Sequence, residues 1–308
     1  MKKLLLIIPF LLFNGCSVGS NLMYINEGET PKMKITILDQ QSFNKKSTNG
    51  IELSELSDLA YDVKNHKLYA VGDKGNFYIF NALFKEKIEQ LVYIKGFKLR
   101  EEKSEKYYDS EGLTFNNKGQ LYLSFEKYPR ITTLTKEGYI KKNQKLPKKL
   151  RDKKNYKHAN AIFEALAWHP KYGLLTAAEY PMFKKRQTNQ TIYSLKGREW
   201  HFKAQNDENS AITAMEVMDD GNVLVLERAY AGLSKPIVIT LKKVYLNKCN
   251  KKSQCKTDVL ASFNSFNGWS VANYEGLTKI SKNRYLMVSD NGNKEYLSTT
   301  FVYFEVNK

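Results

Sequence analysis

The chain has 308 residues, and its 49 Lys and Arg against 32 Asp and Glu give a formal net charge of +17. This length is enough for one large domain with a buried core, and three cysteines exclude a small scaffold built on disulfides. The charge favours anionic partners, although a solvated Lys-rich surface explains it as well. No nucleic-acid-binding motif occurs, so we predict no nucleic-acid partner.

The first residues have the composition of an export signal. Two lysines precede an apolar run, Leu4–Phe13, that is shorter than the about 20 residues a membrane span needs. Cys16 follows Gly15 as in a bacterial lipobox, although the two residues before Gly15 depart from the usual pattern. We predict a signal peptide over residues 1–15 and a lipidated N-terminus and linker over 16–31. The lipid on Cys16 would hold the protein in the cell envelope, facing the periplasm or at the outer membrane; plain secretion is the alternative.

Five segments of the chain share one pattern: an acidic residue, an apolar strand, a polar turn, a second apolar strand and another charge. They begin SDLAY, SEGLTF, FEALAW, ITAMEV and YEGLTK, and their starts differ by 53, 53, 49 and 62 residues. In four copies two carboxylates stand fifteen residues apart, and in the fourth copy Thr213 and Arg228 take these places. A period near 50 with several short strands per unit predicts the blades of a β-propeller.

The predicted fold class is all-β, a propeller of five four-stranded blades, with a sixth, degenerate blade as the alternative. The 20 Tyr and 16 Phe of the chain also favour strands. The fifth unit ends after its third strand, near the C-terminus. The segment Lys32–Leu38 can supply the fourth strand, which would place both termini in one blade and leave no open edge. The predicted propeller domain therefore covers residues 32–308.

Cys249 and Cys255 bracket the polar stretch NKKSQ in the longest repeat. In an oxidising compartment the two thiols would close a small disulfide loop. Free thiols or metal ligands are the alternatives, but no His lies close in sequence to complete a zinc site.

The path of a meander blade places the repeated charges. The innermost strand runs from one face of the ring to the other and the second strand returns, so the start of the first and the end of the second share a face. We therefore expect the paired carboxylates around one mouth of the central channel, as ligands of a metal ion: Asp58, Asp73, Glu111, Glu126, Glu164, Glu179, Glu275 and Asp290. The alternative is that they are strand-end charges bonded to backbone amides.

Loops on the same face carry cations. They include Lys74, Lys127, Arg130, Lys294, the run Lys184-Lys185-Arg186, and nine basic residues between Lys141 and Lys157. Carboxylates surrounded by cations suit an anionic ligand bridged by hard cations, and calcium, with about six to eight oxygen ligands, is the expected ion. Lys127, Arg130 and Arg228 are the predicted substrate-binding residues. A structural charge network without metal is the alternative.

The repeats resemble the bacterial family called "esterase-like activity of phytase". The resemblance covers roughly residues 50 to 306 and rests on SEGLTF with LYLSFEKYPRI, on FEALAW, on VLVLERAY, and on YEGLTKI with LMVSDNG. It implies a phosphoester or ester hydrolase on a propeller, dependent on calcium. The residues in the matching motifs are Glu111, Glu126, Glu164, Glu179, Arg228, Glu275 and Asp290. The Asp-rich opening motif of the propeller phytases is not recognised, which argues against phytate as the substrate.

Other catalytic signatures do not occur. The segment GWSVA lacks the last glycine of a nucleophile elbow, and the four histidines form no metal-spaced pair, with His66 and His169 expected to be exposed in turns. Catalysis would then rest on a metal, on Arg228 to stabilise charge, and on Glu164 or Glu275 as proton acceptor. Three hypotheses remain open: a hydrolase of anionic phosphoesters or esters, a calcium-dependent lactonase, and a non-catalytic platform that binds another envelope component. We expect a monomer.

Overall fold

The computed structural model describes residues 23–25, 33–44, 46–101, 109–183, 188–232 and 234–307. The predicted signal peptide, Cys16, most of the linker and the run Lys184-Lys185-Arg186 lie outside these ranges. No helix of the described residues is long and apolar enough to cross a membrane.

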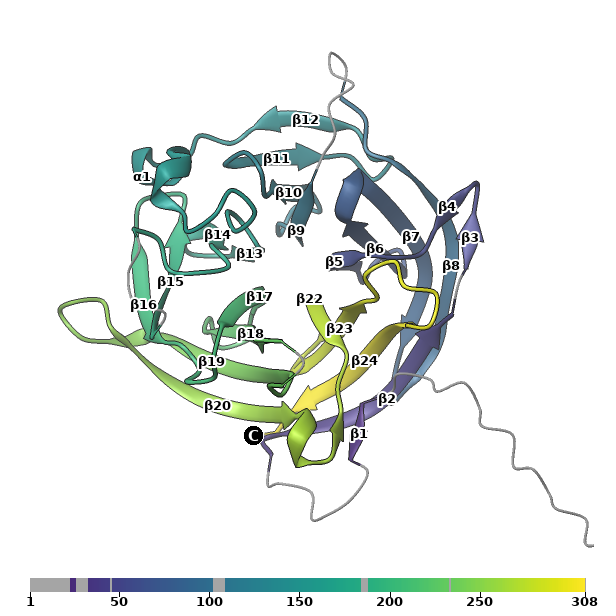
Figure 1. Ribbon diagram of the computed structural model, residues 1–308. Coiled ribbons are helices and arrows are strands. Elements are labelled where there is room, and N and C mark those ends of the chain that lie inside the picture. The colour runs from purple at the N-terminus through teal and green to yellow at the C-terminus, as the bar shows by residue number, and fades with distance from the viewer. Residues whose placement is uncertain are drawn as a thin grey trace, which may run out of the picture.

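Five four-stranded antiparallel sheets stand around a central axis, as Figure 1 shows, and this confirms the five-bladed propeller. Blade 1 contains β5 (Leu56–Asp62), β6 (Lys67–Gly72), β7 (Asn76–Phe84) and β8 (Ile88–Lys98). Blade 2 contains β9 (Ser110–Phe115), β10 (Leu121–Phe125), β11 (Arg130–Leu134) and β12 (Ile140–Asn143). Blade 3 contains β13 (Ala165–His169), β14 (Gly173–Ala177), β15 (Asn189–Ser194) and β16 (Glu199–Lys203).

Blades 4 and 5 complete the ring. Blade 4 contains β17 (Ser210–Val217), β18 (Val223–Ala229), β19 (Val238–Cys249) and β20 (Cys255–Asn264). Blade 5 contains β22 (Asn273–Ser281), β23 (Arg284–Asp290), β24 (Thr299–Val306) and β2 (Ile35–Phe43). Outside the blades are β1 (Tyr24–Ile25) paired with β21 (Trp269–Ser270), β3 (Ser47–Thr48) paired with β4 (Ile51–Glu52), the helix α1 (Lys148–Arg151), and three 3-10 turns at Asp73–Gly75, Lys153–Asn155 and Ser265–Asn267.

The ring is closed in blade 5 by the N-terminal strand. β2 pairs antiparallel with β24 from Ile35 opposite Val306 to Phe43 opposite Thr299. The prediction of a shared blade is therefore confirmed, with the strand starting a few residues later than Lys32, which itself is outside the described residues. Because both termini enter the same sheet, neither β2 nor β24 remains as an unpaired edge facing a gap in the ring.

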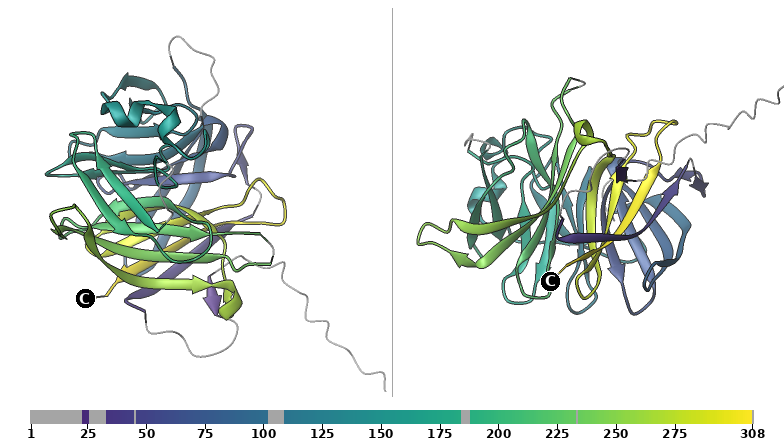
Figure 2. Two further views of the ribbon diagram at one scale, coloured as in Figure 1. Left: turned by 60° about the vertical axis from the view of Figure 1, so that its left-hand side comes forward. Right: turned by 90° about the horizontal axis from the view of Figure 1, so that it is seen from below.

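An apolar layer lies between each pair of neighbouring blades. The innermost strands β5, β9, β13, β17 and β22 contact one another in sequence around the channel, and β22 contacts β5. Five clusters of buried apolar side chains fill the wedges between the sheets, one for each interface. The side views of Figure 2 show the strands running between the two faces of the ring. The aromatic residues of the strands supply much of these layers, for example Phe80 against Phe301 and Tyr285 against Phe304.

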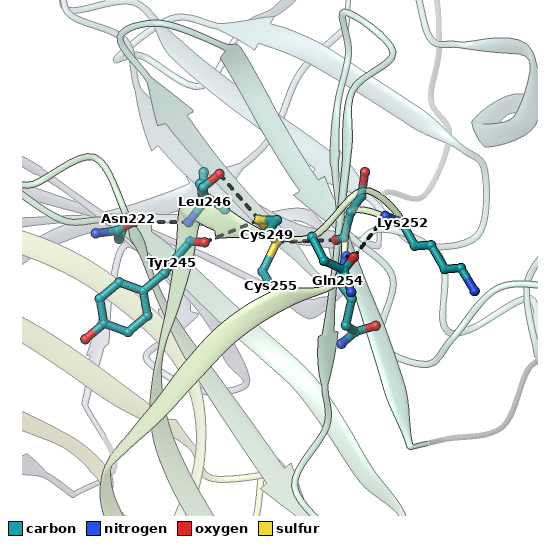
Figure 3. Close-up of a disulfide and its surroundings, with 9 residues drawn as sticks. Asn222, Tyr245, Leu246, Cys249, Lys252, Gln254 and Cys255 are labelled. Atoms are coloured by element: carbon teal, nitrogen blue, oxygen red, sulfur yellow. Dashed lines mark hydrogen bonds between the residues drawn. A yellow bond between two sulfur atoms is a disulfide. The ribbon is translucent and has the colours of Figure 1, made fainter.

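The structure joins Cys249 and Cys255 by a disulfide at the tip of the β19–β20 hairpin, as expected (Figure 3). The hairpin reaches across to blade 3, where the backbone N–H of His201 donates to the carbonyl of Ser253 over 2.8 Å. The disulfide therefore closes the tip of a hairpin that connects blade 4 to blade 3.

His169 corrects an expectation from the sequence. Its ring is buried, not exposed. Its Nε2 lies 3.0 Å from the carbonyl oxygen of Gly221, and its Nδ1 accepts the backbone N–H of Lys171. The turn after β13 folds over the imidazole ring, which packs against the β17–β18 turn of blade 4. This contact between blades cannot be predicted from the sequence of the turn alone. His66 is exposed as expected.

Candidate functional site: an acidic channel mouth

A β-bulge at the start of the innermost strand presents the first charge of the repeat. In blades 4 and 5 the ladder skips one residue, Thr213 and Glu275 respectively, and in blade 2 it is irregular at the same place, around Glu111. Glu164 takes the corresponding position directly before β13. A bulge re-aims a side chain relative to the flanking residues, so these positions point to the mouth while the rest of the strand packs into the blade.

The second charge follows the return strand. Asp73 directly follows β6, Glu126 directly follows β10, and Glu179 is the second residue after β14. Arg228 is the last residue but one of β18, and Asp290 is the last residue of β23. The structure brings these residues together with the bulge residues at one end of the channel. Two groups have ligand atoms within 4.8 Å of one another: Asp73, Asp109 and Glu111 form one, and Glu126, Glu164 and Glu179 form the other. We call them the first and the second carboxylate triad.

Seven of the eight predicted carboxylates belong to this mouth. Glu275 and Asp290 stand beside the triads, where both interact with the charge of Arg228. Two site residues were not identified from the sequence, Asp109 and Asn273. They share a position two residues before the bulge, and Glu55 has the same place in blade 1. Polar residues at that third repeated position are the signal that could have identified them.

Asp58 is the predicted ligand that the structure does not bring to the mouth. In blade 1, Tyr61 pairs with Leu68, seven residues on, whereas the matching pairs in the other four blades are six residues apart. The extra turn residue moves Asp58 by one position on the strand, and a shift of one residue turns a side chain to the other face. The bulge position itself is Ser57, whose hydroxyl donates to Asp73 over 3.2 Å.

The carboxylate of Asp58 serves the backbone instead. Its Oδ2 accepts the N–H of Leu113 at 2.8 Å and its Oδ1 accepts the N–H of Leu277 at 3.0 Å. These residues are in β9 and β22, so Asp58 ties three innermost strands together. For this residue the alternative reading, a charge bonded to backbone amides, describes the contacts, and we leave it out of the metal site.

Burial raises the pKa of the seven predicted carboxyl groups that lie at the mouth. The pKa of Asp73 is raised to about 6, and those of Glu126 and Glu275 to about 8. For Glu111 and Glu164 the charges of neighbouring carboxylates add to the effect of burial and raise the pKa well above the usual value. A low-dielectric site with like charges disfavours ionisation, so protons and a cation would compete for these carboxyl groups.

Arg228 is the basic group inside the mouth. Its Nη1 donates to Glu275 at 2.5 Å and to Asn273 at 2.6 Å, and its Nη2 lies 3.4 Å from Glu179. Burial works against the charge of Arg228, but the carboxylates of Glu275, Glu164 and Glu179 outweigh it and raise its pKa. Arg228 is one guanidinium beside eight carboxyl groups, the seven predicted ones and Asp109.

The predicted substrate-binding cations on the rim are engaged in ion pairs. Lys127 Nζ lies 2.8 Å from Asp109, at the edge of the first triad. Arg130 forms a two-point pair with Glu101, with contacts of 2.5 and 3.2 Å, and also donates to Asn143. Arg130 is thus held by the rim of blade 2, while Lys127 is in direct contact with a mouth residue.

A pocket of about 460 Å³ opens beside the mouth, between blades 4 and 5. Arg228, Asn273 and Asp290 form its inner end, and the loops after β18 and β23 form its walls. The candidate site therefore consists of two parts, an acidic mouth and an adjoining pocket, and together they offer oxygen ligands, a proton acceptor, a guanidinium and a concave surface.

Two solved structures are among those to which the chain is similar. The fold is similar to that of the WD40 domain of Neurospora crassa Pan2, with 9% identity, 89% of this chain and 96% of that chain covered, and a TM-score of 0.36. It is also similar to that of streptogramin B lyase, with 7% identity, coverage of 87% and 97%, and a TM-score of 0.38. Likeness at this level carries no information on function, and no curated protein matches the chain.

The sequence itself identifies the family. The family described as "Phytase-like: Esterase-like activity of phytase" matches residues 51–293, which span blades 1 to 4, the two inner strands of blade 5 and every residue of the acidic mouth. The chain therefore belongs to the phytase-like family.

Proposed function

We propose that the protein is a calcium-dependent hydrolase of esters or phosphoesters, and that the acidic mouth is its active site. The observation that carries the proposal is the pair of carboxylate triads, each with three ligand atoms within 4.8 Å. Calcium prefers about six to eight oxygen ligands, many of them carboxylates. The donor set fits, because it is all oxygen and its charge is offset by Arg228 only in part. Asp73, Asp109 and Glu111, or Glu126, Glu164 and Glu179, would hold the ion.

The residues of the chain have distinct roles in this proposal. Calcium would supply Lewis-acid polarisation of the substrate oxygen. Glu164 makes no side-chain hydrogen bond among the described residues, so its carboxyl oxygens are available to accept a proton from attacking water. Glu275 is held by Arg228 and Asn273, so we assign it a positioning role. Arg228 fixes Glu275 and Glu179, and its remaining N–H groups face negative charge that develops on the substrate.

Hydrolysis of 4-nitrophenyl esters and phosphates, of a lactone and of inositol hexakisphosphate, each in calcium and in chelator, tests the function. We expect turnover in calcium and none in chelator. For Glu164→Gln we expect a fall in kcat of about 100-fold or more, because a positioned proton acceptor contributes that much. Glu89→Gln is the matched control, since Glu89 is exposed on the outermost strand of blade 1. Absence of turnover on every substrate would reject the hydrolase and favour a binding platform.

We also propose that the mature chain is anchored in the cell envelope through Cys16. The support is the sequence of the first sixteen residues, since this segment lies outside the described structure. Cys16→Ser should move the protein from the membrane fraction to the soluble fraction. Unchanged membrane association of that variant would contradict the anchor.

A further inference from the structure

The pocket beside the mouth has two chemically different ends. Its outer walls are mainly apolar and include Tyr180, Tyr230, Ile237, Val271 and Leu297. Its inner end is polar and consists of the mouth residues already described. The volume of about 460 Å³ lies within the range of small-molecule sites, which are usually apolar with a few polar groups that fix orientation. The elements beneath it, β18 and β22, lie side by side in Figure 1.

The pocket is joined directly to the acidic mouth. Arg228 lines it and also binds Glu275, and Asn273 lines it and donates to Glu275 over 2.9 Å and to Asp290 over 3.2 Å. On the opposite wall, the side chain of Tyr180 is hydrogen-bonded to Glu179 of the second triad. A molecule bound in the pocket therefore has one end next to the carboxylates of the mouth.

The charges around the pocket discriminate among substrates. Its lining includes Asp290 and two cations: Arg228, which already contacts Glu275 and Glu179, and Lys294, on the loop after β23 that forms one wall. A polyanion such as inositol hexakisphosphate carries more phosphates than these two cations can pair, so it would place several of them against the carboxylates and leave the apolar walls in water. An uncharged ester would bury its apolar part against the walls, and its binding free energy would become more favourable with the apolar area removed from water.

We propose that this pocket holds the apolar group of the substrate, and that the substrate is an uncharged ester carrying one compact aryl or short alkyl group. This inference rests on the proposed hydrolase function and selects the substrate class for it. The wall residues Val271 and Ala272 set the depth of the pocket, because they pack against the apolar layer between blades 4 and 5 and cannot retreat from a ligand.

Binding is measured separately from turnover with an unreactive ligand, 4-nitrophenyl propyl ether, by isothermal titration calorimetry. Ala272→Phe and Leu297→Trp fill the pocket, and each should weaken binding of the ether by about tenfold or more because overpacked sites cost that much. The control is Val63→Phe, an equally bulky change at an exposed residue in the β5–β6 turn on the opposite face. Thermal unfolding of the three variants identifies any that does not fold.

Turnover gives the second readout. The wild type should hydrolyse 4-nitrophenyl butyrate with a lower KM than the acetate. Ala272→Phe should raise KM for the butyrate by about tenfold or more, while Val63→Phe keeps the wild-type KM and kcat for both esters. Ether binding without any turnover would reject the hydrolase and keep the pocket. Turnover with no ether binding, or with equal binding by all variants, would overturn the pocket proposal and leave the hydrolase. Tight binding of inositol hexakisphosphate by the calcium-free protein would also overturn it.

Discussion

Two buried charge groups meet at neighbouring residues of β18, and they differ in how their charge is balanced. Glu227 faces blade 3 and pairs with Lys242 at 2.6 Å, both side chains being about 1–2% exposed. Lys242 also donates to the carbonyl of Lys203, and Glu227 accepts the N–H of Gln205. Arg228, the next residue, faces the mouth, where it pairs with Glu275 and Glu179 beside six further carboxyl groups.

The difference in charge balance indicates a structural role for the Glu227–Lys242 pair and a functional role for the mouth. The Glu227–Lys242 pair is complete within the chain and links blade 4 to the end of blade 3, so removal of either partner leaves an uncompensated charge. The mouth is incomplete, because its carboxyl groups raise one another's pKa and three of them, Glu111, Glu126 and Glu164, make no side-chain hydrogen bond among the described residues. This group of carboxyl groups without full partners at one end of the channel is the basis of the proposed calcium site.

The largest expected effect is a break in the balanced group. Lys242→Met should lower the free energy of unfolding by about 3–5 kcal/mol, because it strands the buried carboxylate of Glu227. Denaturant unfolding in chelator measures it. The matched change in the mouth is Glu111→Gln, which removes one like charge and should leave the unfolding free energy of the calcium-free protein unchanged or raise it. A loss as large as that of Lys242→Met would show that the mouth is also a closed structural network.

An intermediate effect is expected at Asp58. Asp58→Asn replaces one acceptor by an amide N–H that faces a backbone N–H of β9 or β22, and should cost about 1–3 kcal/mol of unfolding free energy. Calcium affinity should stay at the wild-type value, because Asp58 does not join either triad. Weakened calcium binding without loss of stability would instead show that Asp58 is a ligand of the calcium site.

The pH dependence of stability sharpens the comparison further. The raised pKa values, about 6 for Asp73 and about 8 for Glu126 and Glu275, mean that between roughly pH 4 and 8 the folded protein binds more protons than the unfolded chain. The unfolding free energy of the calcium-free protein should therefore fall as pH rises through this window. Calcium should stabilise the protein by mass action, and more so at pH 8 than at pH 5. Equal stabilisation at both values, measured by thermal unfolding, would contradict an ion held by these carboxylates.

The sequence predicted the fold because every blade repeats the same spacing of apolar strands, and five copies in register leave few alternatives. It predicted most of the mouth for the same reason. It misplaced Asp58 because one additional turn residue in blade 1 shifts the strand without disturbing the apolar pattern. It could not assign Arg130, because the partner Glu101 comes from a different connection and only the folded chain brings the two together.

The most direct test of the central claim is calcium titration of the mature domain by isothermal calorimetry at neutral pH. The wild type should bind calcium, and Glu111→Gln combined with Glu164→Gln, one residue from each triad, should abolish binding, while Asp58→Asn should bind as the wild type does. No calcium binding by the wild type, or unchanged affinity in the double variant, would contradict the assignment of the acidic mouth as a metal site.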